Sequence, residues 1–520
     1  MNSLALATPF RARRTAGSRF ALVALVGAAL STVPSILSAA STAKIEPVAI
    51  DAIFAEWNKP TTPGVALAVI HEGAIVYERG YGQANIERKV AITPQTAFYI
   101  GSVSKQFTAA AIALLAQRKV ISLDDDVRKY VPELPDYGTP VTIRQCVHHT
   151  SGLRDYLALR ALAGEPVNAT FTDDDVLALI RRQKALNFPP GTGHLYSNSG
   201  YFVLSLIVKR TTGKSLRDFA AENFFGPLGM KTAQYRDKHT HPIPNRAEGY
   251  AALGNGYRVS NPNFDVVGAG GVFMTVRDFL AWDRNFYDAK IGGADFVAQL
   301  QTPGLLNNGT DTRYAFGLTV GQYRGLKVVE HSGAYGGFKA HVIRFPNQRL
   351  SVVCFTNLGA MTPGVLVRKV ADACLAGAFP SAATVAASTS APSATVDAAG
   401  AVLTETQAGN GKAGKASQGG KTQKSPPAAP TALTPAEAAR FAGTYRSDEL
   451  NVAYQIVAEA SSGALKLERR GNPTASLTPE AANTFATSGL KLRFNRDERG
   501  NIASFSLEAG RVRDLAFTRQ

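Results

Sequence analysis

A serine and a lysine stand three residues apart in the segment Gly101-Ser-Val-Ser-Lys105. Residues at i and i+3 share one face of a helix, so the Lys105 amine can reach the Ser102 hydroxyl. A basic group beside a hydroxyl activates it as a nucleophile toward acyl carbonyls. On its own, the pair also fits a helix-capping serine beside a surface lysine.

The apolar residues that surround this pair predict the element that must carry it. The helical period is followed by Val103, Phe107, Ala110, Ala111 and Leu114. We therefore expect a buried helix with Ser102 in its first turn, where the helix N-terminus adds positive potential at the hydroxyl.

Two further segments carry groups suited to acyl-transfer chemistry. The first contains Tyr196 and Asn198, just after the turn-forming Pro189-Pro-Gly-Thr-Gly193. The phenol can carry a proton and the amide can hydrogen bond a substrate. The second is His331-Ser-Gly333-Ala-Tyr-Gly-Gly337, whose glycines let a ligand approach the backbone. Taken singly, these segments also fit an ordinary loop and a hairpin turn.

In this order, the three segments resemble the motifs of the serine β-lactamase and penicillin-binding-protein superfamily. Tyrosine in the second motif is similar to the branch of class C β-lactamases, DD-carboxypeptidases, D-aminopeptidases and related esterases. The resemblance covers residues 45–378. Further matching phrases are Pro63-Gly-Val-Ala-Leu-Ala-Val69, Thr96-Ala-Phe-Tyr-Ile-Gly-Ser-Val-Ser-Lys105, His149-Thr-Ser-Gly-Leu153 and Gly268-Ala-Gly-Gly271.

The resemblance implies a role for each matching residue. Ser102 attacks an acyl carbonyl and forms an acyl-enzyme, while Lys105 and Tyr196 share the proton that the hydroxyl loses. Either a protonated Lys105 lowers the pKa of the phenol, or a neutral Lys105 is itself the base, and the sequence leaves both open. The oxyanion hole is implied at the backbone N–H groups of Ser102 and Ala334. The implied substrate-binding residues are Asn198, His331, Ser332 and Gly333.

The third motif begins with His331, where many relatives carry lysine. A permanent charge there helps to bind a substrate carboxylate, whereas histidine is mostly neutral at pH 7. We therefore expect a serine hydrolase of esters or small peptides and amides, including D-amino-acid ones, with weak or no β-lactam hydrolysis. The alternative is a non-catalytic penicillin-binding or sensor protein that is acylated without turnover.

No metal or cofactor is predicted. The three cysteines, Cys146, Cys354 and Cys374, are too few for a disulfide framework, and buried free thiols or a single Cys354–Cys374 bridge both fit. The pairs His148-His149 and His239-Thr-His241 lack a third ligand at metal-binding spacing, so we expect surface or loop histidines.

The composition predicts four regions. Residues 1–43 have four arginines before an apolar run at 20–30 and no acidic residue, which is typical of a secretory signal peptide cleaved near Ala40 or Ala43. The apolar run is too short for a bilayer span, so a periplasmic or secreted protein without a stable membrane span is expected. Residues 44–378 form the catalytic domain, and residues 379–432, rich in Ala, Ser, Gly and Lys, form a flexible linker.

Residues 433–520 alternate apolar and polar residues in short stretches separated by Gly or Asn turns. This pattern predicts a small antiparallel sheet or barrel, similar to the lipocalin-like domain of some related hydrolases. For the catalytic domain, the resemblance implies an antiparallel sheet flanked by helices and joined to a helical subdomain. The fold class is thus mixed α/β of the α+β type, with a small all-β domain after it.

The net charge of +16 is spread over the four regions. The arginines of residues 1–43 account for +4 and the linker for +2, which leaves +10 for the folded parts. Such an excess, without a basic stripe interleaved with aromatics, indicates solubility rather than nucleic-acid binding. The expected partner is a small ester or peptide substrate, and the sequence does not indicate an oligomeric state.

Overall fold

The structure is a computed structural model that describes residues 43–380 and 433–520. The predicted signal peptide and linker therefore lie almost wholly outside the described residues. Among the residues described, none of the helices has the length and apolar character that crossing a bilayer requires.

A six-stranded antiparallel sheet forms the centre of the catalytic domain. Its central strands β1 and β13 are buried along almost their whole length, which is why they read as continuous apolar runs. The strands, in sheet order, are β10 (Thr319–Tyr323), β11 (Leu326–Tyr335), β12 (Phe338–Phe345), β13 (Leu350–Thr356), β1 (Val65–His71) and β2 (Ala74–Tyr81).

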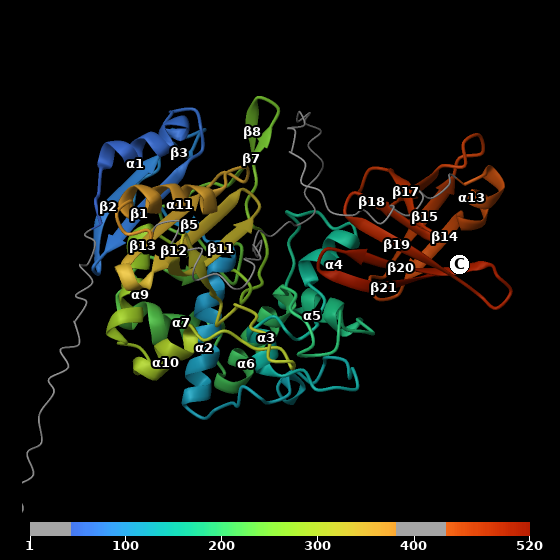
Figure 1. Cartoon of the computed structure of the whole chain (residues 1–520), viewed down its shortest axis with the longest axis horizontal. Helices are drawn as coiled ribbons and strands as arrows, with labels where there is room; N and C mark the ends of the chain where they lie inside the picture. Colours follow the sequence, from blue (N-terminus) through green and yellow to red (C-terminus); the bar gives the residue numbers. More distant parts are fainter. Residues whose placement is uncertain (1–42, 381–432) are drawn as a thin grey trace, which may run out of the picture. The chain divides into compact units, whose positions relative to one another are not determined.

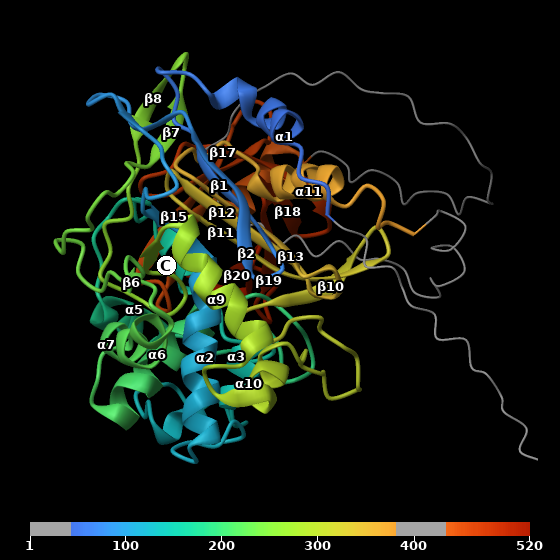
Figure 2. The ribbon, with the colours of Figure 1, turned by 90° about the vertical axis from the view of Figure 1, so that its left-hand side faces the viewer.

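Helices cover both faces of this sheet (Figure 1). On one face, α1 and α11 bury an apolar cluster that includes Phe54, Leu67 and Val367. On the other face lie α9 and the start of α2, as a second view shows (Figure 2). The helices of this domain are α1 (Pro47–Phe54), α2 (Lys105–Gln117), α3 (Ile143–Val147), α4 (Tyr156–Leu162), α5 (Asp173–Arg181), α6 (Asn198–Thr212), α7 (Leu216–Ala220), α8 (Gly226–Leu228), α9 (Val276–Asp288), α10 (Gly293–Leu300) and α11 (Pro363–Cys374).

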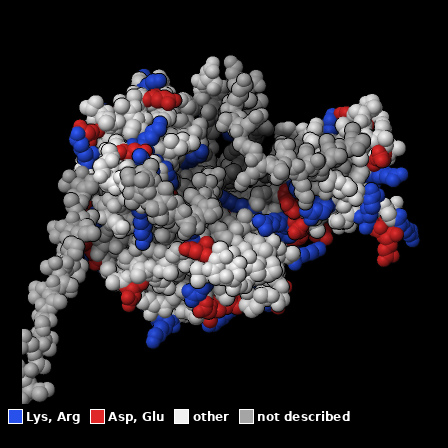
Figure 3. All heavy atoms as spheres, viewed as in Figure 1, with Lys and Arg blue, Asp and Glu red and all other residues white. Residues whose placement is uncertain are grey.

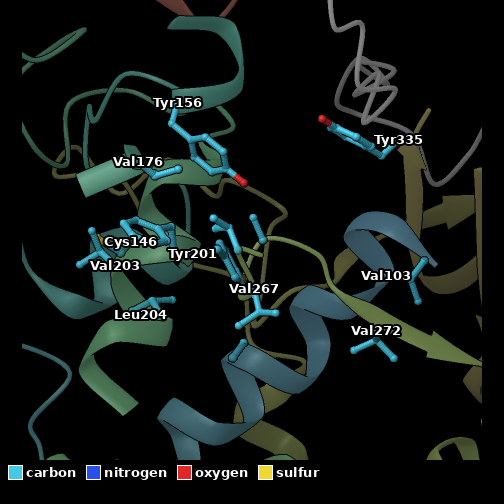
Figure 4. Close-up of a cluster of buried hydrophobic side chains, with 14 of the residues drawn as sticks. Val103, Cys146, Tyr156, Val176, Tyr201, Val203, Leu204, Val267, Val272 and Tyr335 are labelled. Atoms are coloured by element: carbon cyan, nitrogen blue, oxygen red, sulfur yellow. The ribbon is translucent and has the colours of Figure 1, made fainter. Parts of the chain in front are cut away.

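The predicted buried helix is α2, which packs against α6. All five of its predicted core positions are buried. Beside α6, the Cys146 side chain of α3 lies next to Val203 and Leu204 (Figure 4). α6 begins at a Ser197 cap and ends at Gly213 in the left-handed conformation (φ +71°), so both ends of this core helix are fixed by local sequence.

Short elements complete the domain. Tight helical turns, all of the 3-10 type except the π-helical η4, are η1 (Ala55–Trp57), η2 (Gly101–Ser104), η3 (Val127–Lys129), η4 (Ala221–Phe225) and η5 (Pro346–Gln348). The small antiparallel sheets pair β3 (Gln83–Asn85) with β4 (Val90–Ala91), β9 (Val272–Met274) with β5 (Phe98–Tyr99) and β6 (Gln234–Tyr235), and β7 (Tyr250–Leu253) with β8 (Gly256–Val259).

The C-terminal residues form a closed eight-stranded barrel after the short helix α13 (Pro435–Phe441). Alternate residues of its strands are buried, as the predicted period of two requires. Closure pairs the last strand with the first, so the barrel has no open edge. The strands are β14 (Gly443–Ser447), β15 (Val452–Ala458), β16 (Leu465–Glu468), β17 (Ala475–Ala481), β18 (Thr484–Thr487), β19 (Leu490–Arg496), β20 (Ile502–Ala509) and β21 (Val512–Arg519).

The cysteines and surface charges follow simple patterns. Cys146, Cys354 and Cys374 are all buried free thiols, so the Cys354–Cys374 bridge is absent from the described structure. On the face seen in Figure 3, basic and acidic side chains are interspersed over the described surface.

Candidate active site

Ser102 lies in the 3-10 turn η2, immediately before α2. The sequence predicts Ser102 in the first turn of the α-helix. In the structure this turn is a 3-10 turn, and the α-helix begins at Lys105. Gly101 adopts φ +53°, a conformation that favours glycine, and the Ser104 hydroxyl donates to the Gly101 carbonyl at 2.6 Å. The turn is thus held locally, and Ser102 remains half-buried at its outer side.

Lys105 is fully buried beneath Ser102. Its Nζ lies 3.1 Å from Ser102 Oγ, and it donates to Asn198 Oδ1 at 2.8 Å and to the Ala269 carbonyl at 2.6 Å. Burial lowers the pKa of Lys105 well below its usual value, Arg511 lowers it further, and Asp155 raises it. A neutral amine has two N–H donors and one lone pair. The two donors would match the Asn198 and Ala269 oxygens, and the lone pair would face the Ser102 hydroxyl.

Tyr196 lies in the segment before α6 and shares a cavity with Ser102. The Lys105 Nζ is 4.8 Å from the centre of its ring. Burial raises the pKa of Tyr196 above its usual value, and the nearby Ser102 has a smaller lowering effect. Among the described residues its hydroxyl has no hydrogen-bond partner, so the phenol is a neutral group beside the nucleophile rather than bonded to it.

Asn198 links the lysine to a buried carboxylate. Its Oδ1 accepts from Lys105, and its Nδ2 donates to Asp155 Oδ2 at 2.7 Å. Asp155 also accepts from the Asn198 backbone at 2.8 Å and caps α4 through the N–H groups of Leu157 and Ala158. The structure thus uses this amide to position Lys105, and its predicted contact with substrate stays a prediction.

His331 is buried in the sheet on β11. Its Nε2 lies 2.9 Å from the Tyr314 hydroxyl and its Nδ1 lies 2.6 Å from the Ser332 carbonyl. Burial, with a smaller effect from Lys105, lowers the pKa of His331 to about 3. The ring is therefore neutral at pH 7. It lies behind the cavity wall, whereas its neighbours Ser332 and Gly333 line the cavity.

The two predicted oxyanion-hole amides, those of Ser102 and Ala334, lie where β11 passes η2. A Cβ atom on Gly101 would stand 2.6 Å from the Ala334 nitrogen, and one on Gly333 would stand 2.9 Å from the Ser102 nitrogen. Both glycines are needed for this close approach. The backbones of η2 and β11 thus lie in close contact at these two nitrogens, and their role as an oxyanion hole stays a prediction.

The cavity at Ser102 is tight, with a free volume of about 30 Å³, room for roughly one water molecule. Tyr156 from α4 and Tyr335 from β11 both line it, and Figure 4 labels the two side chains. The guanidinium of Arg511, from the C-terminal barrel, also lines it. A larger depression of about 720 Å³ lies near α10 and contains none of the predicted site residues.

Several residues of this site were not predicted from the sequence. Asp155 and Arg511 belong to no recognised motif. Ala269 belongs to the matching segment Gly268-Ala-Gly-Gly271, but nothing in that segment indicates that its carbonyl contacts Lys105. His148 and His149 were expected at the surface or in a loop; they lie in the turn after α3, but both are buried rather than at the surface. The His149 ring lies 4.1 Å from that of Tyr196, tilted by 39°, and its Nδ1 accepts from the Ser197 N–H, so it holds the second motif in place.

No group of three or more His, Cys, Asp or Glu side chains in the described ranges is arranged to hold a metal ion. The arrangement at Ser102 brings together a hydroxyl, a buried amine and a buried phenol, which are groups that acyl transfer through a serine nucleophile can use.

Comparison with known protein families matches residues 50–376 to the family described as Beta-lactamase. The chain belongs to this family. Similar curated proteins are the D-aminopeptidases of Cereibacter sphaeroides (34% identical over 297 residues, 57% of each chain) and Gluconobacter oxydans (32% over 296 residues, 57% of this chain and 56% of that one). The chain thus spans a little over half the length of the curated relatives it matches.

Solved structures of the same fold include the octameric penicillin-binding protein homologue from Pyrococcus abyssi. It has a TM-score of 0.57 and 21% identity, and the match covers 92% of this chain and 99% of that one. A D-amino acid amidase from Ochrobactrum anthropi SV3 has a TM-score of 0.54 and 25% identity, over 64% of this chain and 98% of its own. These likenesses confirm the fold class predicted from the sequence.

Proposed function

We propose that this protein is a serine hydrolase that cleaves amide or ester bonds of small substrates, including D-amino-acid amides and peptides, through an acyl-enzyme on Ser102. The observation that carries the proposal is the 3.1 Å contact between Ser102 Oγ and the buried Lys105 Nζ. The similarity to D-aminopeptidases and to a D-amino acid amidase supports the substrate class.

The protonation of the site supports a particular proton path. Burial disfavours the charged amine and holds the pKa of Lys105 well below its usual value, so we propose that the unprotonated amine takes the Ser102 proton through its lone pair. Tyr196 keeps its proton at neutral pH and can give it to the leaving group. The proton on Lys105 then passes to Tyr196 and regenerates its phenol. Lys105 and Tyr196 can also activate the water that hydrolyses the acyl-enzyme.

The site also supports a preference against β-lactams. At the third motif, the neutral His331 offers no positive charge to a β-lactam carboxylate, where a lysine would. We expect cephalosporin hydrolysis to be weak or absent beside the hydrolysis of short p-nitrophenyl esters and D-alanine p-nitroanilide. Efficient turnover of a chromogenic cephalosporin would contradict this ranking.

The decisive experiment is intact-mass spectrometry with a fluorophosphonate and a panel of esters, D-amino-acid amides and β-lactams. The unmodified chain should gain one adduct that maps to Ser102, and S102A should gain none and lose turnover by roughly 10³-fold or more. Adduct formation that persists in S102A would show that another residue is the nucleophile. A single burst without steady turnover for every substrate would favour the sensor alternative.

We propose in addition that the protein is exported, with residues 1–43 as a cleaved signal peptide. The four arginines followed by the apolar run at 20–30 support this. N-terminal sequencing of the protein recovered from a periplasmic fraction should begin near residue 41 or 44, and an intact Met1 in that fraction would contradict cleavage.

A further inference from the structure

Arg511 stands at the tip of the hairpin between β20 and β21, in the C-terminal barrel. Hydrogen bonds to the catalytic domain fix this hairpin. Asn187 donates to the Arg511 carbonyl at 3.0 Å and accepts from the Arg513 N–H at 2.8 Å, while Arg154 donates to the carbonyls of Arg513 and Asp514. The backbone at the tip is therefore held in place while the Arg511 side chain reaches the cavity of Ser102.

The guanidinium of Arg511 is positioned but weakly bonded. It lies 4.5 Å from the centre of the Tyr196 ring, and its Nη1 is 3.4 Å from Asp155 Oδ2, the one hydrogen bond it makes among the described residues. Asp155 already accepts four shorter hydrogen bonds from Leu157, Ala158 and Asn198. Because a guanidinium has five N–H donors, Arg511 retains donors for a ligand.

Arg154, in the same interface, shows how a purely structural arginine is bonded. Its side chain is fully buried, donates to Glu449 at 2.6 Å and makes hydrogen bonds to three further oxygen acceptors. Arg511 has 19% of its side chain exposed, lies over the Tyr196 ring and makes one long hydrogen bond, within an ion pair to Asp155 at 3.4 Å. The difference points to a guanidinium at Arg511 whose remaining N–H donors bind a ligand.

The positive charge of Arg511 indicates which kind of ligand it would bind. Among the described residues that line the cavity, Arg511 is the only one with a formal charge, since the others are apolar, hydroxyl, amide or glycine residues. A guanidinium fits a carboxylate through two parallel N–H···O bonds. An anionic substrate group would therefore find its partner in Arg511 rather than in the neutral His331.

Resting on the proposed hydrolase activity, we propose that Arg511 binds a carboxylate of the leaving group, so that favoured substrates are short peptides that release an amino acid with a free C-terminus. The leaving-group side follows from the contact with Tyr196, the group proposed to protonate the departing nitrogen.

In this step the bond between Ser102 Oγ and the acyl carbon forms and the amide C–N bond breaks. The Ser102 proton passes to Lys105, and the Tyr196 proton passes to the nitrogen of the released amino acid. Water then hydrolyses the ester and regenerates Ser102. Arg511 takes no part in the proton transfers and is a specificity-determining residue.

The test compares two substrates that differ by one charge, D-alanyl-glycine and D-alanyl-glycinamide. In the wild-type protein, kcat/KM should favour the carboxylate. In R511Q the ratio of the two kcat/KM values should fall by roughly 10- to 100-fold, the usual effect of losing a charge-assisted hydrogen bond, and R511K should lie between. R513Q is the matched control, because Arg513 is an exposed cation on the same hairpin and should leave the ratio unchanged.

The two proposals fail in distinguishable ways. Turnover of D-alanyl-glycinamide by the wild type and its loss in S102A test the hydrolase alone. If the wild type treats both substrates equally, or if R511Q keeps the wild-type ratio, the proposal for Arg511 is wrong and the hydrolase stands. Should R511Q prove unstable in thermal denaturation, R511K decides, because it keeps a charge and loses the bidentate geometry.

Discussion

Lys105 is a lysine with no solvent contact, held by an amide oxygen and a backbone carbonyl below the nucleophile. A neutral base of this kind gives a definite pH dependence. The value of kcat/KM should rise with pH as Lys105 loses its proton, and this acidic limb should lie well below the usual lysine range. A pH–rate profile on a substrate without ionisable groups in this range measures it.

Replacing Arg511 by glutamine should move this acidic limb to higher pH. The positive charge of Arg511 disfavours a proton on Lys105, so removing it raises the pKa of the lysine. The profile should be measured with p-nitrophenyl acetate, which has no carboxylate to contact residue 511 and no group that titrates in this range. R513Q should keep the wild-type limb, and a limb that stays fixed in R511Q would show that Arg511 does not influence Lys105.

At the residue scale, sequence spacing could predict Ser102 and Lys105 because both belong to one turn. It could not choose between a charged and a neutral Lys105, since that depends on burial, which comes from the tertiary structure. Arg511 is 356 residues from its partner Asp155 and lies in another domain. Nothing local in the sequence distinguishes it from Arg513, its exposed neighbour on the same hairpin.

The third motif shows the same limit at the scale of elements. By themselves its residues also fit a hairpin turn, and such a turn is present at Gly336 and Gly337, but β11 continues through the rest of the motif to Tyr335. The strand continues because its pairing with β12 extends through the motif. The glycines of the motif favour a turn, so the sequence alone does not indicate this pairing. In the barrel, the segments of β14, β17 and β18 were not predicted as strands, and β17 contains Pro479, a residue that argues against a strand.

Gly333 should be intolerant of even one methyl group. A Cβ there would stand 2.0 Å from the Ile100 carbonyl oxygen and 2.9 Å from the Ser102 nitrogen, so β11 would have to move away from η2. We expect G333A to cost about 1–3 kcal/mol of stability and to lower kcat by at least 10-fold, because the oxyanion amides separate. Thermal denaturation and steady-state kinetics measure the two effects.

The control for this change is G321A in β10. Gly321 also lies in the sheet, but a Cβ there would meet nothing within 4 Å. This variant should keep wild-type kinetics and be neutral or slightly more stable, because alanine has less backbone freedom to lose on folding. Equal losses in the two variants would show that strand glycines matter generally and that the contact with η2 has no special role.

At the scale of the whole molecule, the barrel takes part in the active site. Its hairpin closes one side of a cavity whose other walls come from η2, α4 and β11. Sequence patterns could predict that a small β domain exists, because an alternation of period two is local. They could not predict its contact with the site, since docking depends on the shapes of two folded surfaces.

The ion pair between Arg154 and Glu449 should therefore support both stability and specificity. With both side chains almost wholly buried, E449Q leaves Arg154 as an uncompensated cation, which should cost about 3 kcal/mol of unfolding free energy. Because Arg154 also holds the hairpin carbonyls, E449Q should reduce the preference for D-alanyl-glycine as well. D448N is the matched control, since its pair with Lys184 spans 3.6 Å with both side chains about 70% exposed, and should change stability by less than about 0.5 kcal/mol. Denaturant unfolding of the full chain compares the two, and equal effects at 448 and 449 would mean that the buried pair does not couple the barrel to the catalytic domain.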